Sequence, residues 1–86
     1  MKQMRQAARK QERNQRFRSA ARTYIRRTRR LIAEGRLEEA QKVAHKAIST
    51  LDKAAVKGIL HRNNVARRKS RLMHQLNEAL SQQAGE

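Results

Sequence analysis

Three residue types found in hydrolytic enzymes, a histidine, a serine and an aspartate, follow one another at His45, Ser49 and Asp52. Steps of four and three residues place them on one face of a helix. A hydrolase of this type also needs a strained nucleophile, an oxyanion hole and a pocket that excludes water. A chain of 86 residues in which alanine is the commonest apolar residue has little room for such a pocket. We therefore interpret the three residues as a polar, solvent-facing surface, and we predict that the protein is not an enzyme.

Metal and cofactor chemistry has no support in the sequence. The chain has no cysteine, which excludes disulfides and cysteine-based zinc sites. We expect neither His61 nor His74 to have a second metal ligand at suitable spacing on its own helix. The sequence also lacks a glycine-rich phosphate loop, so a nucleotide-dependent reaction is not indicated. We therefore predict that the protein binds neither a cofactor nor a metal ion.

Arginine at steps of three and four residues is the dominant pattern of the first third of the chain. Within the ladder that runs from Arg5 to Arg30, Glu12 is the one acidic residue, and Glu34 follows it. Like charges at these steps repel one another on an isolated helix. Arginine's planar guanidinium binds phosphate through two hydrogen bonds at once. The pattern therefore predicts binding to a polyanion, and the excess of arginine over lysine favours a nucleic acid.

A second basic group surrounds Gly58. Lys57 and His61 flank the turn that this glycine predicts, and four further cations fall in the first two turns of the helix expected to follow. These cations are Arg67, Arg68, Lys69 and Arg71. Cations are unfavourable at a helix N-terminus, whereas a bound phosphate would satisfy both the free N–H groups and the cations. We therefore predict phosphate binding at this turn.

The two groups together form the predicted nucleic-acid-binding surface. Its members are Arg5, Arg9, Arg13, Arg16, Arg18, Arg22, Arg26, Arg27, Arg30, Lys57, Gly58, His61, Arg62, Asn63, Asn64, Arg67, Arg68, Lys69, Ser70 and Arg71. His61, Asn63 and Ser70 can hydrogen-bond a ribose hydroxyl or a base edge. We expect the second group to position the nucleic acid and the arginines before Phe17 to supply general attraction.

Helices are the elements that must position these side chains. Apolar residues recur every three or four positions in three segments, as on one buried helical face, and no segment alternates like a strand. We predict an all-α fold, a three-helix bundle with a long, projecting first helix. The expected parts of this single domain, residues 1–86, are a basic helical arm at 1–16, a packed part of the first helix at 17–34, and helices at 37–57 and 63–82. Gly35 and Gly58 would end the first two helices, and Asn63 or Asn64 would cap the third.

Charge distinguishes the segments of the chain. Lysine and arginine number 22 against 7 aspartate and glutamate residues, for a net charge of +15. Residues 1–36 hold 13 basic and 2 acidic groups, a net charge of +11. A chain this basic requires a polyanionic partner. No apolar run reaches membrane-spanning length, and the first residues lack the apolar centre of a secretory signal.

The run KGILHRNNVARRKSRL, residues 57–72, resembles the signature of the S-twenty family of bacterial small-subunit ribosomal proteins. That signature is Lys-Gly, an aliphatic pair, His, a basic residue and Asn, followed by Ala-Arg-x-Lys-Ser-Arg-Leu. Weaker similarity lies in RSAARTYIRR, residues 18–27, and LDKAAVKG, residues 51–58. The first residues, MKQMRQAARK, depart from the Ile-Lys-Ser-Ala-like start of the family. The family's contacts are therefore not carried over to residues 1–15.

The resemblance implies a three-helix bundle that binds 16S-type ribosomal RNA directly and helps its assembly. The implied partners are the small ribosomal subunit and two parts of that RNA, the 5′ domain and the long penultimate helix near the 3′ end. The implied location is the ribosome in the cytoplasm, with an organellar ribosome left open. No membrane or DNA partner and no catalytic activity are implied.

Two other function classes compete with RNA binding. A DNA-binding helical protein would show helix-turn-helix spacing or a dimer surface, and we find neither pattern. A membrane-active amphipathic helix would need bulky apolar residues opposite the arginines, whereas the residues before Phe17 offer mostly alanine, glutamine and methionine. Preference for a 16S 5′-domain fragment over duplex DNA and anionic vesicles would separate the three classes.

Overall fold

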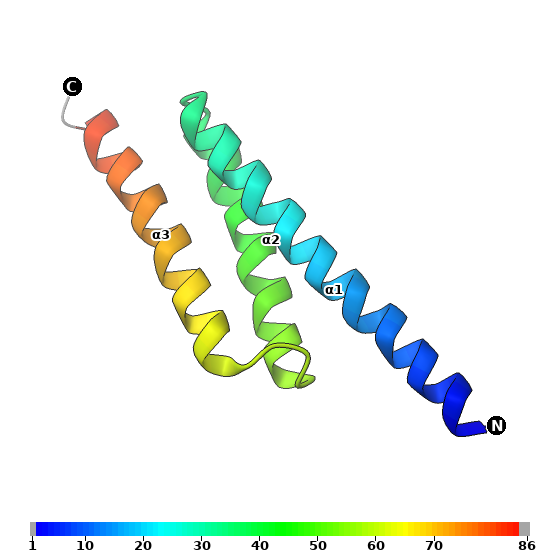
Figure 1. The fold of residues 1–86 in the computed structure, drawn as a ribbon. Coiled ribbons are helices and arrows are strands. Elements are labelled where there is room, and N and C mark those ends of the chain that lie inside the picture. The colour runs from blue at the N-terminus through cyan, green and yellow to red at the C-terminus, as the bar shows by residue number, and fades with distance from the viewer. Residues whose placement is uncertain (1, 85–86) are drawn as a thin grey trace.

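The computed structural model describes the backbone of residues 2–84 and the side chains of residues 9–83. Three helices make up the fold: α1 spans Lys2–Ala33, α2 spans Leu37–Val56 and α3 spans Arg62–Ala84. No strand occurs among the residues with described backbone. The Cα trace measures 62 × 22 × 13 Å, and the N-terminal half of α1 runs past the turn between α2 and α3 (Figure 1). This confirms the predicted all-α bundle with a long, projecting first helix.

Small side chains allow α1 and α2 to pack closely along their common length. Ala40, Ala44 and Ala47 of α2 are almost completely buried. They face a strip of α1 that includes Ala21 and Ile25, which belong to the same apolar cluster. Because the separation of two helix axes depends on the side chains at the contact, an alanine face brings the backbones near each other. The α1–α2 pair is the most extensive helix contact of the molecule.

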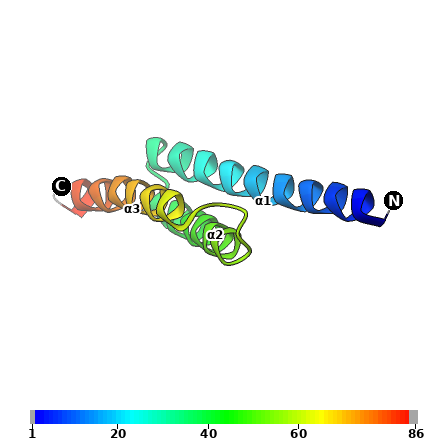
Figure 2. The same cartoon turned by 60° about the horizontal axis from the view of Figure 1, so that its bottom comes forward.

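The third helix packs mainly on α2 and contacts α1 over a shorter stretch. Leu51 of α2 and Leu72 of α3 are both fully buried at this centre, and Val65 and Leu76 extend the contact along α3. Figure 2 shows α3 beside α2, with α1 above the two. A single apolar cluster therefore holds all three helices.

One polar side chain lies in this core. Thr28 is fully buried, and its hydroxyl donates a hydrogen bond of 2.8 Å to the carbonyl oxygen of Tyr24, one turn earlier in α1. This bond satisfies a group that would otherwise be costly to bury. Thr28 can therefore occupy an apolar position of the helix.

The two turns that reverse the chain have the same backbone geometry. Gly35 and Gly58 have φ angles of 77° and 73°. The Gly35 N–H donates to the Ile32 carbonyl and the Gly58 N–H to the Ala55 carbonyl, both at 3.1 Å. With the next N–H bonding one residue further back, each turn is a Schellman motif. No described atom lies within 4 Å of a Cβ built at either glycine, so glycine is needed for its positive φ and not for space.

The start of α3 corrects the predicted cap. The helix begins at Arg62, and the residue in the N-cap position is His61, whose carbonyl accepts from the Val65 N–H at 3.1 Å. The His61 ring accepts from the Asn63 N–H at the same distance. Asn63 is therefore inside the helix. Asn64 uses its side-chain oxygen to accept from Arg68 at 3.0 Å instead of capping.

Candidate nucleic-acid interface

Antiparallel packing of α1 and α2 brings the two predicted basic groups to the same end of the bundle. The Arg18 guanidinium of α1 donates a hydrogen bond of 3.2 Å to the carbonyl oxygen of Ile59 in the α2–α3 connection. The Lys57 ammonium lies 5.6 Å from the centre of the Phe17 ring, within the range of a cation–π contact. We call this region, residues 9–18 with residues 53–71, the Gly58 end.

The predicted α1 arginines lie on the surface of the helix that faces solvent, away from its buried side. The buried positions Ala21, Ile25 and Thr28 occupy one side of α1, so the other side is left to solvent. All eight predicted α1 arginines with described side chains are exposed: Arg9, Arg13, Arg16, Arg18, Arg22, Arg26, Arg27 and Arg30. Arg5 falls outside the residues with described side chains. The helix therefore presents a continuous cationic strip over its described length.

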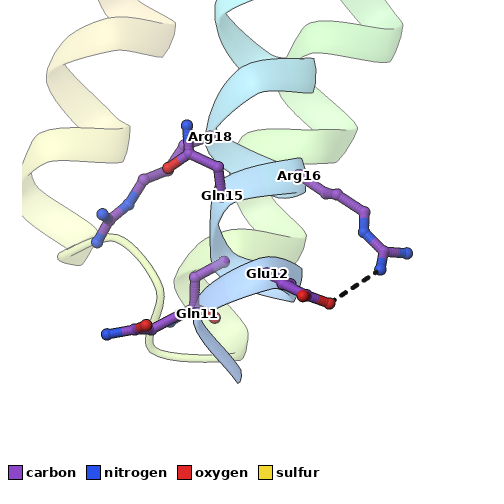
Figure 3. A pocket seen from close by; sticks show the side chains of 6 residues that line it. Gln11, Glu12, Gln15, Arg16 and Arg18 are labelled. Atoms are coloured by element: carbon purple, nitrogen blue, oxygen red, sulfur yellow. Dashed lines mark ion pairs between the residues drawn. The ribbon is translucent and has the colours of Figure 1, made fainter. Parts of the chain in front are cut away.

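The N-terminal part of this strip is shown in Figure 3. Gln11, Glu12, Asn14, Gln15, Arg16 and Arg18 line a shallow hollow on α1. Arg18 and Gln11 point toward the α2–α3 connection, whereas Arg16 extends to the other side and pairs with Glu12 at 3.9 Å (Figure 3). Both members of that pair are largely exposed, so the attraction between them is weak. The hollow is therefore open surface and not an enclosed pocket.

Packing of α1 begins one turn earlier than the apolar pattern predicts. Asn14 is partly buried, although it is polar and precedes Phe17. Its side-chain oxygen is buried without a hydrogen-bond partner among the described residues. Residues 9–13 are exposed. The packed part of α1 thus starts at Asn14, and hydrophobic periodicity gave no signal for it because the residue is not apolar.

The four cations at the start of α3 do not share one surface, contrary to the grouping that the sequence suggested. Lys69 turns toward α2, where its ammonium lies 2.9 Å from the Asp52 carboxylate. Arg68 bonds Asn64 on its own helix. Arg67 and Arg71, four residues apart, are exposed, and no ion pair of theirs occurs within residues 9–83. A helix rotates by about 100° per residue, so adjacent cations necessarily point in different directions.

The remaining predicted residues of this end lie at the surface. Gly58, His61, Arg62, Asn63 and Ser70 are exposed, and Asn64 is half-buried. Lys53 lies in the last turn of α2, four residues before Lys57, and is exposed. The sequence did not predict it as part of the nucleic-acid interface. A lysine in the last turn of a helix is equally well explained by its favourable interaction with the helix dipole, so its type and position alone did not indicate binding.

Carboxylates gather at the opposite end of the bundle, around Gly35. Glu34 lies 3.4 Å from Arg30 and 3.6 Å from Arg36, and Glu39 lies 2.6 Å from Arg36. The hydrogen bond and charge of Glu39, followed by the charge of Glu34, raise the pKa of Arg36 above its ordinary value. We call residues 30–39 the Gly35 end. Its cations face carboxylates of the same chain, which leaves less positive field for an external anion.

The residues first considered for catalysis lie apart from this arrangement. His45, Ser49 and Asp52 border an open hollow on the outer surface of α2, and Asp52 is engaged with Lys69. Their geometry supplies no nucleophile–base pair, because no hydrogen bond joins them in the described structure. They act as solvent-facing residues, and Asp52 also ties α2 to α3.

His61 and His74 are the histidines for which the sequence predicts no second metal ligand. His74 does have a carboxylate neighbour, Glu78, whose oxygen lies 3.8 Å from Nε2; the expectation that its own helix offers no second ligand was wrong. Two ligands do not make a metal site. Among the residues that the structure describes, no three His, Asp or Glu side chains are grouped closely enough to hold a metal ion.

No helix in the described part of the chain has an apolar stretch that could cross a membrane.

Comparison with known proteins shows similarity over nearly the whole chain. The family model described as Ribosomal protein S20 matches residues 1–77. The small ribosomal subunit protein bS20 of Thermomicrobium roseum is 53% identical over 74 residues, which is 86% of this chain and 75% of that protein. The bS20 protein of Dehalococcoides mccartyi strain 195 is 49% identical, covering 91% and 89% of the two chains. The bS20 protein of Aquifex aeolicus is 42% identical, covering 95% and 87%.

Proposed function

Because the chain belongs to the ribosomal protein S20 family, we propose that it binds 16S-type ribosomal RNA directly and helps that RNA assemble into the small ribosomal subunit. The protein is a structural constituent of the ribosome and not an enzyme. Its place in the cell is accordingly the ribosome.

One observation supports direct RNA binding above all others. The Arg18–Ile59 hydrogen bond and the Lys57–Phe17 contact join the α1 strip and the α2–α3 turn into one cationic region. The carboxylates at the Gly35 end are engaged with Arg30 and Arg36. The positive field is therefore concentrated where the exposed hydrogen-bonding side chains His61, Asn63 and Ser70 also lie. Phosphate attraction combined with groups that read ribose or base edges is what a folded RNA requires.

The 5′ domain and the long penultimate helix are the RNA partners that we propose. Exposed cations come from two separate helices, α1 through Arg22 and Arg26, and α3 through Arg67 and Arg71. Two RNA segments can thus be held by one rigid bundle. Holding two segments in a defined relation is how a protein without catalytic groups can assist assembly.

Competition binding tests the proposal. The full chain is titrated with a 16S 5′-domain fragment, a random RNA of equal length, duplex DNA and anionic vesicles at about 150 mM salt. We expect preference for the fragment, with a slope of log K against log salt of roughly −6 to −9 if about 8 to 10 phosphates are neutralised. A slope shallower than about −2, or equal affinity for duplex DNA, would contradict the proposal. Nucleotide protection in reconstituted subunits then identifies the RNA segments.

A further inference from the structure

The His61 ring has a defined hydrogen-bonding state in the folded chain. Its Nδ1 accepts the hydrogen bond from the Asn63 N–H at 3.1 Å, so Nδ1 carries a lone pair and no proton. A neutral imidazole has one accepting and one donating nitrogen. The cap on α3 therefore leaves the ring's proton on Nε2. The Val65–His61 backbone bond places the residue at the N-cap independently of its side chain.

Because Nδ1 points at the Asn63 N–H, the geometry of the imidazole ring directs Nε2–H away from that group. His61 is exposed, and no acceptor for this donor occurs within residues 9–83. Lys57 and Arg62 lie on either side of it in the chain, at the Gly58 end. A neutral, oriented donor is thus held among cations that attract RNA.

We infer that His61 is a specificity-determining residue of the RNA interface, donating its Nε2–H to an acceptor atom of the bound RNA while Nδ1 caps α3. This inference rests on the proposed RNA-binding function. The donor's direction is set by the cap, so the folded α3 N-terminus and the RNA contact depend on the same ring. An arginine in this place would bind phosphate of any sequence, whereas a neutral donor at one angle discriminates between acceptor positions.

A neutral donor has a signature that a cation lacks. Affinity from cations arises largely from counterion release and therefore changes with salt. Loss of the Nε2–H contact should weaken binding by about fivefold at every salt concentration, as for one neutral hydrogen bond, and leave the salt slope unchanged. Replacing Arg67 with glutamine should instead make the slope shallower, by somewhat less than one unit for one phosphate contact.

Two substitutions of His61 distinguish the role of Nδ1 in capping α3 from the role of Nε2 in binding RNA. In His61→Asn the side-chain oxygen replaces Nδ1, and asparagine is a strong N-cap, but nothing reaches the position of Nε2. In His61→Gln the longer amide reaches toward Nε2 with a donor, but the cap is lost. We expect His61→Asn to keep the thermal midpoint and lose about fivefold in affinity for the 5′-domain fragment. We expect His61→Gln to keep affinity within about twofold and to lower the midpoint by roughly 4 °C or more.

His45→Gln, an exposed histidine on the outer surface of α2, is the matched control and should change neither quantity. The ring tautomer of free wild-type protein, read by nitrogen NMR, tests the cap without RNA and should show the proton on Nε2. A proton on Nδ1, wild-type affinity in His61→Asn, or an equal loss of affinity in both variants would overturn the inference. Failure of the wild-type protein to prefer the fragment would instead refute the proposed function, while the tautomer would still report on the cap.

Discussion

The two turns of the bundle are alike in backbone and opposite in surface chemistry. Gly35 and Gly58 adopt nearly the same φ, and their neighbouring N–H groups return to equivalent carbonyls. At the Gly35 end, Arg36 meets Glu34 and Glu39. At the Gly58 end, no carboxylate of the described residues pairs with Lys57, Arg62 or Arg67. The shared geometry shows that each turn serves the fold, and we propose that the placement of carboxylates decides which end binds a polyanion.

The helices that leave the two turns also start differently. At the start of α2, Arg36 is the N-cap and makes no side-chain cap hydrogen bond. Glu38 and Glu39 in the first turn instead complement the helix dipole. At the start of α3 there is no acidic residue in the first turn, and His61 supplies a neutral cap. The first turn of α3 therefore has no carboxylate that would compete with an external anion, whereas the first turn of α2 has two.

Removing three cations from each end should give the largest difference. We expect Lys57→Gln, Arg62→Gln and Arg67→Gln together to weaken binding of the 5′-domain fragment by about a hundredfold and to make the salt slope shallower by roughly 2. The comparison variant, with Arg36→Gln, Lys42→Gln and Lys46→Gln, removes the same charge from the Gly35 end and the first half of α2, and should change affinity by less than about threefold. Fluorescence titration at several salt concentrations measures both. Equal losses would mean that net charge alone, and not its placement, governs binding.

Removing carboxylates should create a second binding end. Glu34→Gln and Glu39→Gln release Arg30 and Arg36 from their ion pairs, and Glu38→Gln removes the third carboxylate of this end. We expect affinity for random RNA at about 50 mM salt to rise roughly tenfold, with a smaller rise for the 5′-domain fragment, because the new contacts are with phosphates only. Paired titrations give the ratio of the two affinities. An unchanged ratio would show that these carboxylates do not restrict binding to the Gly58 end.

Replacing either turn glycine with alanine should reduce the free energy of unfolding by the same amount. Gly35→Ala and Gly58→Ala each force alanine into the left-handed region without a clash, so each should lower the free energy of unfolding by about 1 kcal/mol. Urea unfolding followed by circular dichroism compares them. RNA affinity of the folded fraction should stay within about twofold for both. A much larger affinity loss in Gly58→Ala would indicate that RNA contacts the turn backbone itself.

The smallest effect is expected for Asn63. Its side chain does not cap α3, and no hydrogen bond of that side chain occurs within the described residues, so Asn63→Ala should change the free energy of unfolding by less than about 0.5 kcal/mol. It should nevertheless reduce the preference for the 5′-domain fragment over random RNA by about two- to threefold, whereas Arg9→Ala weakens both RNAs alike. If Arg9→Ala changes the preference more, the N-terminal part of α1 reads the RNA and the turn does not.

Local patterns predicted the helices well because each depends on nearby residues. Apolar spacing located the buried face of each helix, and the two glycines marked the ends of α1 and α2. The N-cap of α3 was misplaced because asparagine is the more usual capping residue, while the neighbouring histidine can accept the same hydrogen bond. Asn14 was missed because a polar side chain gives no hydrophobic signal.

The sequence by itself determined the helical class, the excess of positive charge and the motif around Gly58, since these follow from residue type and local spacing. Only the tertiary structure decided which charges act together. Antiparallel packing over an alanine face placed Arg18 beside Ile59 and Phe17 beside Lys57, although 41 positions separate the first pair in the chain. It also turned Lys69 toward Asp52. Such pairings depend on how one helix is rotated and positioned against another, and that relation is set by the packing of the whole core.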